Sequence, residues 1–474
     1  MQLTQVGGNL LTNGLLVAVV VLAHIQIAAY LIGSSTLMIV SESISIARHG
    51  DERHDRLAHG LMKSSNYVFS FGSALAIFFV VFVLTGVWGR FFAPLQQITF
   101  WMFFVEAIAF VGEIALIYTL YANWDRLAKH RRARLGMLLI LNIDQFWQMF
   151  FIDVVASFML TPNGGDVNIL SQILNPTSIP LDVHRVVGNI AWAGAVVAFA
   201  GGFRYLLATR RLERTSRAAV QAQPALSVGA MSVGASPSEP PEAAEARHWD
   251  WVGQWGAMWA VGLTLLQPWI GYSYAKEIQL HAYPSWYSMM FGDLSNVFLI
   301  QITLLGSIFT LGSLYFWRRM KASGARRHRR QGLLALGLLL VTMFAAIPAW
   351  IAPTYADTFT SGGAKPFWDG GQLVPFATFI PYKVGALFMM VTLGLWSVSS
   401  YLRSYSRNEL GAGFIGRRAA WTLVALGVVT SVMMMVMGVI REHARQPYLI
   451  NGELTIQNQQ ILNGQPSTYG GTSP

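Results

Sequence analysis

Long apolar runs alternate with short polar segments along most of the chain. A membrane-spanning helix needs about 20 predominantly apolar residues, and about ten segments reach that length. They lie at roughly 14–40, 67–89, 99–122, 136–160, 184–208, 251–273, 295–317, 331–352, 376–402 and 418–440. The first run lacks a basic flank and a following small-residue cleavage site, so we expect a retained helix and not a signal peptide. The pattern predicts an all-α, polytopic integral membrane bundle with about ten transmembrane helices.

The charged residues indicate how this bundle lies in the membrane. Only 12% of the 474 residues are charged, against about 25% in a soluble domain, which excludes an ordinary soluble enzyme. The formal net charge is +10. Most basic residues fall in alternate connections, such as Arg48, Arg53, Arg56 and Lys63, then Arg126, Lys129, Arg131, Arg132 and Arg134. The positive-inside rule makes these connections cytoplasmic, with both termini on the outer, periplasmic side of a multi-pass protein.

Nucleic acid is not an expected partner of this basic chain. Its basic residues are not interleaved with base-stacking aromatics on a soluble face, as nucleic-acid binding would require. The lipid bilayer is the partner that the composition predicts instead.

The chain divides at a segment rich in Ala, Ser, Pro and Gly. Residues 213–248 have the composition of a disordered cytoplasmic linker. We therefore expect an N-terminal five-helix half at 1–212, a C-terminal five-helix half at 249–455, and a polar tail at 456–474.

The absence of cysteine from the sequence narrows the choice of cofactors. Without Cys there are no disulfides, Cys-ligated zinc ions, iron–sulfur clusters or C-x-x-C-H haem attachments. A redox cofactor would need His, Met, carboxylate or amine ligands.

Two histidines within apolar spans are candidates for such a ligand. His24 lies about ten residues into the first span, and His184 opens the fifth span after an Asn-Pro break. Intramembrane ionisable residues are costly and commonly functional. His24 alone is equally explained by a hydrogen bond to a neighbouring helix, and His184 by contact with lipid headgroups.

Two carboxylates follow one face of the third span. Glu106 and Glu113 are seven residues apart, which corresponds to about 10 Å along a helix. Buried carboxylates in a row predict a proton path or metal ligation. Asp144 and Gln148 share a face of the fourth span, which indicates a polar interior or helix–helix hydrogen bonds.

Three stretches together resemble subunit I of the cytochrome bd-type quinol oxidases. These are FVGEIALIYTLYANWDRL at 110–127, LNPTSIPLDVH at 174–184 and REHARQPY at 441–448. The last resembles the Glu-x-x-Arg-Gln-Pro-aromatic signature of the family. The resemblance covers about the first 210 residues and resumes from about 376 to 455.

The resemblance implies roles for individual residues. His184 would ligate the low-spin haem, while His24 and Glu442 would ligate the two high-spin haems. Arg445 would contact a haem or its propionate, and Glu113 and Glu106 would conduct protons, although Glu106 is one residue out of the family's register. The implied cofactors are one or more haem b groups, with haem d as a further candidate. The implied partners are a second membrane subunit, quinol and oxygen, in a prokaryotic inner membrane.

The sequence also departs from the family. Gly385 stands at the position of the methionine that completes the low-spin haem, and Gly438 stands at a tryptophan position. Lys383 replaces an arginine, and the quinol loop is short, with spans 295–317 and 331–352 in its place. Within this loop and beside it, Lys276, Glu277 and Lys383 are the candidate quinol-binding residues. The departures predict a divergent member of the family.

Three functions agree with these observations. The first is a haem-binding subunit of a quinol oxidase, which oxidises quinol and passes electrons to oxygen with proton uptake. The second is a quinone-coupled haem b electron-transfer subunit of a larger respiratory complex that does not reduce oxygen. The third is a proton-coupled transporter, which would use the buried carboxylates without a cofactor but would not explain REHARQPY.

Overall fold

The computed structural model describes residues 10–162, 168–222, 240–290, 294–345, 368–369, 372–373, 379–407, 409–410, 415–445, 448–450 and 454–455. Long helices dominate these residues. They are α1 (Leu10–Ala47), α2 (Glu52–Phe78), η1 (Phe79–Val87), α3 (Gly89–Ile98), α4 (Phe100–Leu127), η2 (Ala128–His130), α5 (Arg131–Leu160), α6 (Ile169–Ile173), α7 (Ser178–Ala222), α8 (Pro241–Thr264), α9 (Gln267–His281), α10 (Tyr283–Met290), α11 (Ser295–Ser323), α12 (Arg326–Ala345), α15 (Phe379–Ser406) and α16 (Arg417–His443). Two short antiparallel hairpins pair β1 (Trp368–Asp369) with β2 (Gln372–Leu373), and β3 (Tyr448–Ile450) with β4 (Leu454–Thr455).

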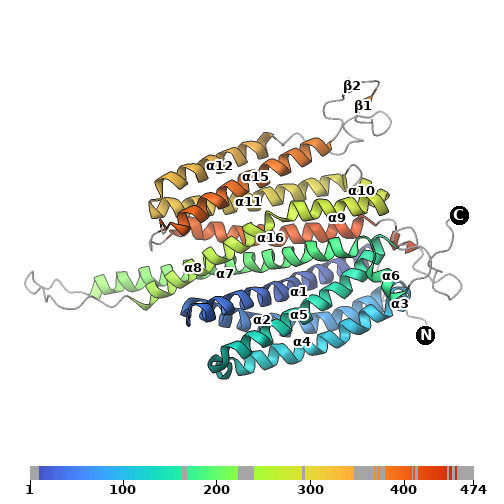
Figure 1. The fold of residues 1–474 in the computed structure, drawn as a ribbon, viewed down its shortest axis with the longest axis horizontal. Helices are drawn as coiled ribbons and strands as arrows, with labels where there is room; N and C mark the ends of the chain where they lie inside the picture. Colours follow the sequence, from blue (N-terminus) through green and yellow to red (C-terminus); the bar gives the residue numbers. More distant parts are fainter. Residues whose placement is uncertain are drawn as a thin grey trace, which may run out of the picture.

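The long helices lie roughly parallel in one bundle (Figure 1). The first group, α1, α2, α4 and α5, packs on one side, and α11, α12 and α15 pack on the other. Between them lie α7, α8 and α16, and α16 contacts helices of both groups. The last long helix of the chain, α16, therefore lies at the centre of the bundle and connects the two groups.

Seven helical stretches of the described chain are long and apolar enough to cross a membrane. One of them, Phe100–Leu160, contains α4, η2 and α5, so it includes two of the ten predicted segments. The predicted span 251–273 is divided between α8 and α9, which are separate helices. The predicted span 331–352 begins within α12, and its residues after Ala345 lie outside the described part. A helical membrane bundle is confirmed, while ten spans and the side of the termini stay predictions.

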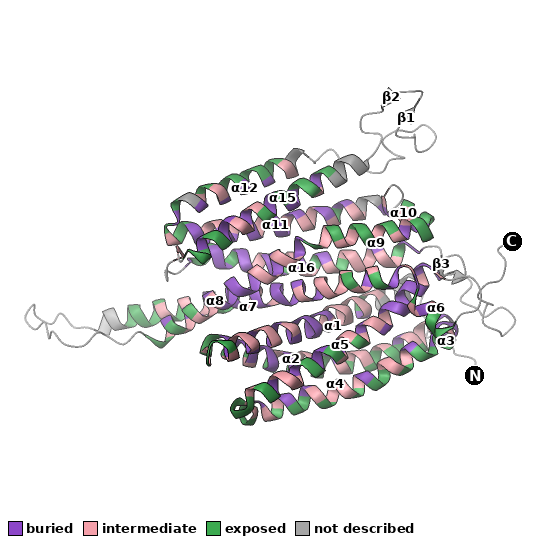
Figure 2. Cartoon of the chain, viewed as in Figure 1, coloured by how far each residue is buried: buried purple, intermediate pink, exposed green. Residues whose placement is uncertain are grey.

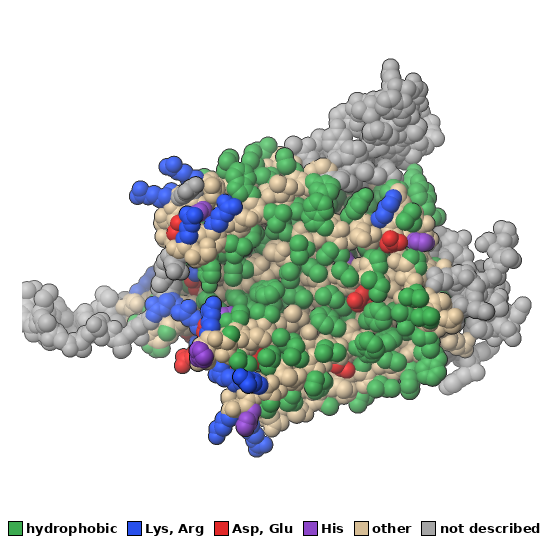
Figure 3. All heavy atoms as spheres, in the orientation of Figure 1, with side chains coloured by type: hydrophobic (Ala, Val, Ile, Leu, Met, Phe, Trp, Pro, Cys, Tyr) green, Lys and Arg blue, Asp and Glu red, His purple; other side chains and the backbone are tan. Residues whose placement is uncertain are grey.

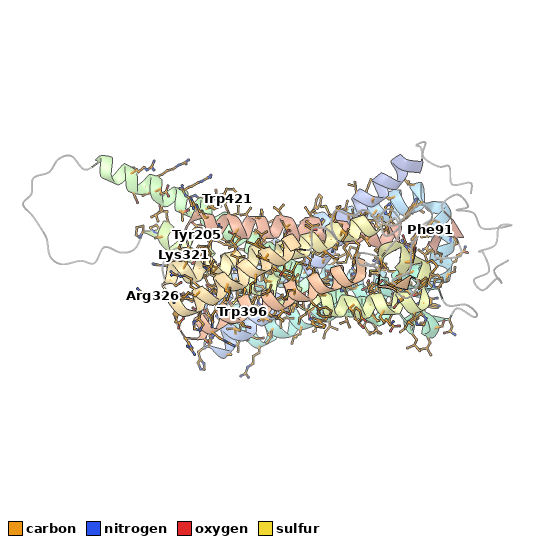
Figure 4. The ribbon with its side chains drawn as sticks, turned by 90° about the horizontal axis from the view of Figure 1, so that it is seen from above. Phe91, Tyr205, Lys321, Arg326, Trp396 and Trp421 are labelled. Carbon is orange, nitrogen blue, oxygen red and sulfur yellow. The ribbon has the colours of Figure 1, made fainter. Side chains whose placement is uncertain are left out.

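The outer surface of the bundle is apolar where lipid would lie. Exposed residues gather on the outward faces of the helices (Figure 2), and many are large and hydrophobic, including Phe71, Ile108 and Ile143. In Figure 3, hydrophobic side chains form a broad belt, and Lys and Arg gather at one end of it. Figure 4 shows Lys321 and Arg326 at that end and Phe91 at the opposite end. This distribution agrees with one cytoplasmic, basic face.

Small residues bring α7 and α8 into backbone contact. A Cβ atom on Gly201 would lie 2.3 Å from the backbone nitrogen of Gly253, and a Cβ on Gly256 would lie 2.4 Å from that of Ala198. Because lipid is as apolar as the side chains, close van der Waals packing of this kind drives helix association in membranes. We call Gly194, Ala198, Gly201, Gly253, Gly256 and Ala260 the glycine seam.

Two polar segments contain more helix than the sequence predicted. Helix α7 continues to Ala222 and α8 begins at Pro241, so both ends of the predicted linker 213–248 are helical. These ends of α7 and α8 project beyond the other helices (Figure 1). The short quinol loop around Lys276 and Glu277 contains α9 and α10. The interior of the linker and the tail 456–474 lie outside the described residues.

Candidate functional site

His24 lies on α1 where α2 changes its helical form. Its ring stacks on Phe79, the first residue of the π-helical segment η1, with the centroids 6.0 Å apart. Its Nδ1 atom is buried and has no hydrogen-bond partner. Single π-helical turns within longer helices often occur at functional sites. The Nδ1 atom therefore makes no hydrogen bond to a neighbouring helix within the described residues.

His184 lies on α7 against the start of α9. Its Nδ1 atom is also buried without a partner, and its ring stacks on Tyr274 at a centroid distance of 6.4 Å. A Cβ on Gly271 would lie 3.4 Å from Cε1 of His184, so glycine leaves room beside the ring. The Gln267 amide donates to the backbone oxygen of His184 at 3.0 Å. The imidazole thus packs against residues of α9.

An ion pair beside His184 was not predicted from the sequence. Arg185 donates to the carboxylate of Asp153 on α5. The Asp153 side chain is 1% exposed, so this charge is fully inside the bundle. The sequence did contain a signal for this pair, namely an arginine and an aspartate in two apolar spans. An ion pair between them offsets the free-energy cost of removing both charges from water.

The end of α16 lies against α1 near His24. A Cβ on Gly438 would lie 2.4 Å from Cδ2 of Leu22, and Ser431 donates to the Oε1 atom of Gln26 at 2.6 Å. Gly438 allows this approach, because a larger side chain at this position would have to displace the side chain of Leu22. One turn beyond, buried Arg445 donates to the carboxylate of Glu442, which is 42% exposed.

Glu113 is the end of a chain of hydrogen bonds between α1, α4 and α5. Its Oε1 accepts from Gln145 at 2.7 Å and its Oε2 accepts from Gln148 at 3.3 Å. Gln145 in turn accepts from Ser35 at 2.6 Å, and Ser35 accepts from Asn142 at 2.8 Å. We call Glu113, Gln145, Ser35 and Asn142 the polar chain. It lies within the bundle and leads toward the C-terminal end of α1 and the N-terminal end of α5.

Other carboxylates flank the polar chain. Gln148 also donates to Asp144 at 3.1 Å, as the shared face of these two residues predicted. Glu106 lies two turns from Glu113 on α4 and is half-buried. The structure therefore brings Asp144 into contact with the site and leaves Glu106 as a separate group on the same helix.

A buried arginine joins the C-terminal end of α1 to the N-terminal ends of α2 and α5. Arg134 donates to Glu42 at 2.6 Å and to Asp55 at 2.5 Å. Its guanidinium also lies 4.4 Å from the ring centroid of Trp124, the tryptophan of NWDRL. Its side chain is 0% exposed. Arg134, which counted among the connecting residues in the sequence pattern, is a core residue of α5.

The candidate quinol residues lie on neighbouring helices. Lys276 is exposed on α9 and donates to Gln279 at 2.8 Å, and Glu277 lies 3.5 Å from His281. Lys383 belongs to the first turn of α15, and its side chain lies outside the described part. Trp269 of α9 packs edge-on to Phe388 of α15 at 4.8 Å, so the two helices are in contact.

Neither methionine next to Gly385 is placed to serve as the second ligand that the family resemblance predicts for the low-spin haem. Space around Gly385 is open, with no side chain within 4 Å of a Cβ placed there. Met389 is 53% exposed on the outside of α15. Met390 is buried, and its sulfur lies 2.6 Å from a Cβ placed on Gly306 of α11. Neither thioether faces α7, which carries His184.

His24 and His184 fit the role of haem ligand better than Glu442 does. A buried imidazole nitrogen without a partner costs free energy unless a ligand satisfies the ring, and both His24 and His184 have one. Glu442 already accepts from Arg445 and is partly exposed. Among the described residues, no group of three His, Asp or Glu side chains could hold a bare metal ion. His24, His184, Glu442 and Arg445 remain predicted cofactor residues.

The chain is similar to known proteins in part of its sequence and in its structure. Residues 14–238 match the family model described as cytochrome bd terminal oxidase subunit I. The structure of the bd oxidase from Geobacillus thermodenitrificans is similar with a TM-score of 0.48 and 12% identity, covering 92% of this chain and 98% of that chain. A search of curated proteins gave no match. The family match includes His24, Glu106, Glu113 and His184 and ends before REHARQPY.

Proposed function

We propose that the chain, whose residues 14–238 match the family model described as cytochrome bd terminal oxidase subunit I, is a haem-binding membrane subunit that oxidises quinol and passes the electrons to oxygen. It would lie in the inner membrane of a prokaryote with both termini outside and with a second membrane subunit beside it. The two buried, unpartnered imidazole nitrogens of His24 and His184 carry the proposal.

Three residues would hold the haems, namely His184 for a low-spin haem and His24 and Glu442 for two high-spin haems. Bound haem supplies one-electron and oxygen chemistry, and the protein sets its ligands and surroundings. Phe79 and Tyr274 fix the planes of the two imidazoles by stacking. Arg445 holds the Glu442 carboxylate and adds a cation suited to a propionate.

Protons would reach the oxygen site from the cytoplasmic side through the polar chain. The hydroxyl of Ser35 can pass a proton by rotating, while Gln145 and Gln148 hold the two carboxylate oxygens of Glu113 in fixed directions. Glu113 would take up the proton at its carboxylate, and Glu106, two turns along α4, would be the next group on this route. Quinol would bind at α9 and α15, where Lys276, Glu277 and Lys383 provide polar contacts.

An absorption spectrum tests the proposal directly. The chain, purified with the subunits that accompany it, should show a Soret band and, after dithionite reduction, signals of both low-spin and high-spin haem. It should also consume oxygen when quinol is added. A preparation without a Soret band would reject haem binding and leave a transporter.

The substitution His184→Ala tests whether His184 is a ligand of the low-spin haem or has only a structural role. Loss of the only protein ligand predicted for that haem should remove the low-spin signal and leave the high-spin signals. An unchanged spectrum would contradict the assignment of His184. Gln267→Ala, which removes only the contact to the backbone oxygen of His184, should retain the low-spin signal.

A second function is favoured by the geometry around Gly385 and Gly438. Without a thioether facing His184, and with α1 packed where the family has a tryptophan, the chain could be a haem b electron-transfer subunit of a larger respiratory complex. A b-type spectrum without a high-spin or chlorin signal, together with no quinol-dependent oxygen uptake, would establish this alternative.

A further inference from the structure

A basic cavity lies at the cytoplasmic end of the first helical group. It is an open cavity of about 770 Å³ between the α1–α2 turn and the α4–α5 turn. Its charged and titratable lining residues are His49, Lys129, His130, Arg131 and Arg132. In Figure 3, Lys, Arg and His side chains gather at this end of the molecule. The lining contains no carboxylate, so the cavity is suited to an anion.

Most of the cations in this cavity are available to a ligand. Arg131 is committed, because it donates to Ser45 at 2.8 Å and lies 4.0 Å from Asp55. Within the described part of the chain, Lys129 and Arg132 are exposed and form no recorded hydrogen bond or ion pair. Two carboxylates at this end of the bundle, Asp51 and Asp55, form ion pairs with Arg48 and with Arg134. The local charge therefore stays positive.

The wall opposite Arg131 is a tight turn. His49 has φ 57° and Gly50 has φ 101°, and the Gly50 amide donates to the Ser45 carbonyl at 2.8 Å. A Cβ on Gly50 would lie 3.8 Å from Nη1 of Arg131. The C-terminal end of α4 and the N-terminal end of α5 meet here, so their dipoles oppose each other. The side-chain cations thus determine the preference for an anion.

An apolar stripe continues from the cavity along α5. Gly136 lies one helical turn after Arg132 on α5, and Leu139, Ile140 and Ile143 follow on the same face. These three apolar residues are 43%, 57% and 63% exposed, respectively. Gly136 has open space around it and leaves a notch directly above the basic residues. Free phosphate would not use this stripe, whereas acyl chains would lie along it.

We propose that this cavity binds the phosphate of an anionic phospholipid of the cytoplasmic leaflet, with its acyl chains along α5. Basic pockets at the cytoplasmic ends of membrane helices favour anionic headgroups for the same electrostatic reason. Lys129 and Arg132 would contact the phosphate, and Arg131 would shape the site from its fixed position. The inference requires that the chain lies in a membrane with its basic end on the cytoplasmic side, and it does not depend on haem or quinol.

The test measures lipid binding to the full chain with its accompanying subunits. Phosphatidylglycerol is titrated into delipidated protein in neutral detergent and bound lipid is counted by native mass spectrometry, with phosphatidylcholine and inorganic phosphate as parallel probes. Lys129→Gln/Arg132→Gln should weaken phosphatidylglycerol binding at least about 10-fold, in line with the loss of two charged phosphate contacts. Arg326→Gln/Arg330→Gln removes the same charge at the same membrane side on α12 and should leave binding unchanged.

Other outcomes overturn the proposal. Equal binding by the Lys129/Arg132 variant and the wild type would exclude the cavity as the site, and equal affinity for phosphatidylcholine would exclude anion recognition. If inorganic phosphate displaces phosphatidylglycerol at equal concentration, the cavity takes free phosphate and not lipid. If the double variant does not fold, Ala133→Trp fills the cavity with all charges retained and should reduce binding similarly; unreduced binding in this variant would also reject the site.

Discussion

Asp153 and Arg185 place a full pair of charges in the interior, one residue from His184. Each ion loses several kcal/mol of hydration on burial, and the partner's charge offsets most of it. The pair is therefore strongly interdependent, even though its net contribution to stability is small. Because Arg185 follows His184 directly on α7, the pair also fixes the rotation of the helix turn that presents the imidazole.

Asp153→Asn should destabilise the protein by about 3–5 kcal/mol, because it leaves the guanidinium of Arg185 buried without a counter-charge. Thermal unfolding in detergent, followed by tryptophan fluorescence, measures the change. The double variant Asp153→Asn/Arg185→Gln removes both charges and should recover most of the loss. A double variant that is less stable than either single variant would show that the two side chains do not act as a pair.

Glu113→Gln should slow oxygen consumption with quinol by at least about 10-fold, since groups that transfer protons commonly contribute more than that. The amide retains the size of the side chain but cannot take up a proton, so the haem absorption should not change. Stopped-flow oxygen uptake and the reduced spectrum measure both properties. Glu242→Gln, a change of a half-buried residue in the first turn of α8 and far from the polar chain, is the control. Unaltered turnover in the Glu113 variant would discard the proton route.

At the scale of elements, the contacts between α7 and α8 join the two predicted halves of the chain. The glycine seam is a continuous backbone contact, and α16 packs against the opposite side of α7, with the Cβ of Leu423 2.8 Å from a Cβ placed on Gly202. Helix α7 carries His184 and α16 carries Glu442. The spacing between these two proposed haem ligands thus depends on helices held together by small side chains.

Gly256→Ala should destabilise the bundle by about 1–3 kcal/mol, because the added methyl group would overlap the backbone of Ala198 at 2.4 Å. Gly262→Ala on the same helix meets nothing within 4 Å, so it should be neutral or stabilise by up to about 1 kcal/mol through helix propensity. Thermal unfolding of both variants measures the difference. Equal midpoints would mean that the helices separate freely and that the seam has no role in stability.

The sequence predicted some elements better than others for physical reasons. Apolar length alone identifies the helices that cross the bundle, and the polar residues of α4 and α5 already indicated contacts around Glu113. The break between α8 and α9 at Leu265–Leu266 was missed, because apolar length cannot distinguish one helix from two that meet at a Pro-containing turn. Partners such as Ser35 for Gln145 were also beyond prediction, since they depend on which helices become neighbours.

On the scale of the whole molecule, the chain has a basic end and an apolar belt but no cysteine. This combination allows its orientation to be measured residue by residue, because any introduced cysteine is the only thiol. It also explains why the strongly basic composition does not indicate nucleic-acid binding. The positive charge lies at one end of the bundle, beside the apolar belt.

Ser216→Cys, on the projecting end of α7, should react with a membrane-impermeant maleimide only after cells are permeabilised. Pro284→Cys, at the start of α10, should react in intact cells, because the positive-inside rule assigns it to the outer face. Gel-shift labelling of both variants measures the two accessibilities, with the unmodified chain as a blank. The reverse pattern would invert the proposed topology.

The contact between α1 and α16 has a consequence for biosynthesis. Ser431 and Gln26 are 405 positions apart in the chain, and Gln26 is two residues from His24. A ribosome must therefore complete almost the entire polypeptide before the surroundings of His24 can close. Insertion of the proposed haem at that histidine would therefore follow translation, and a truncated product would lack the contact between Ser431 and Gln26 that closes α1 against α16.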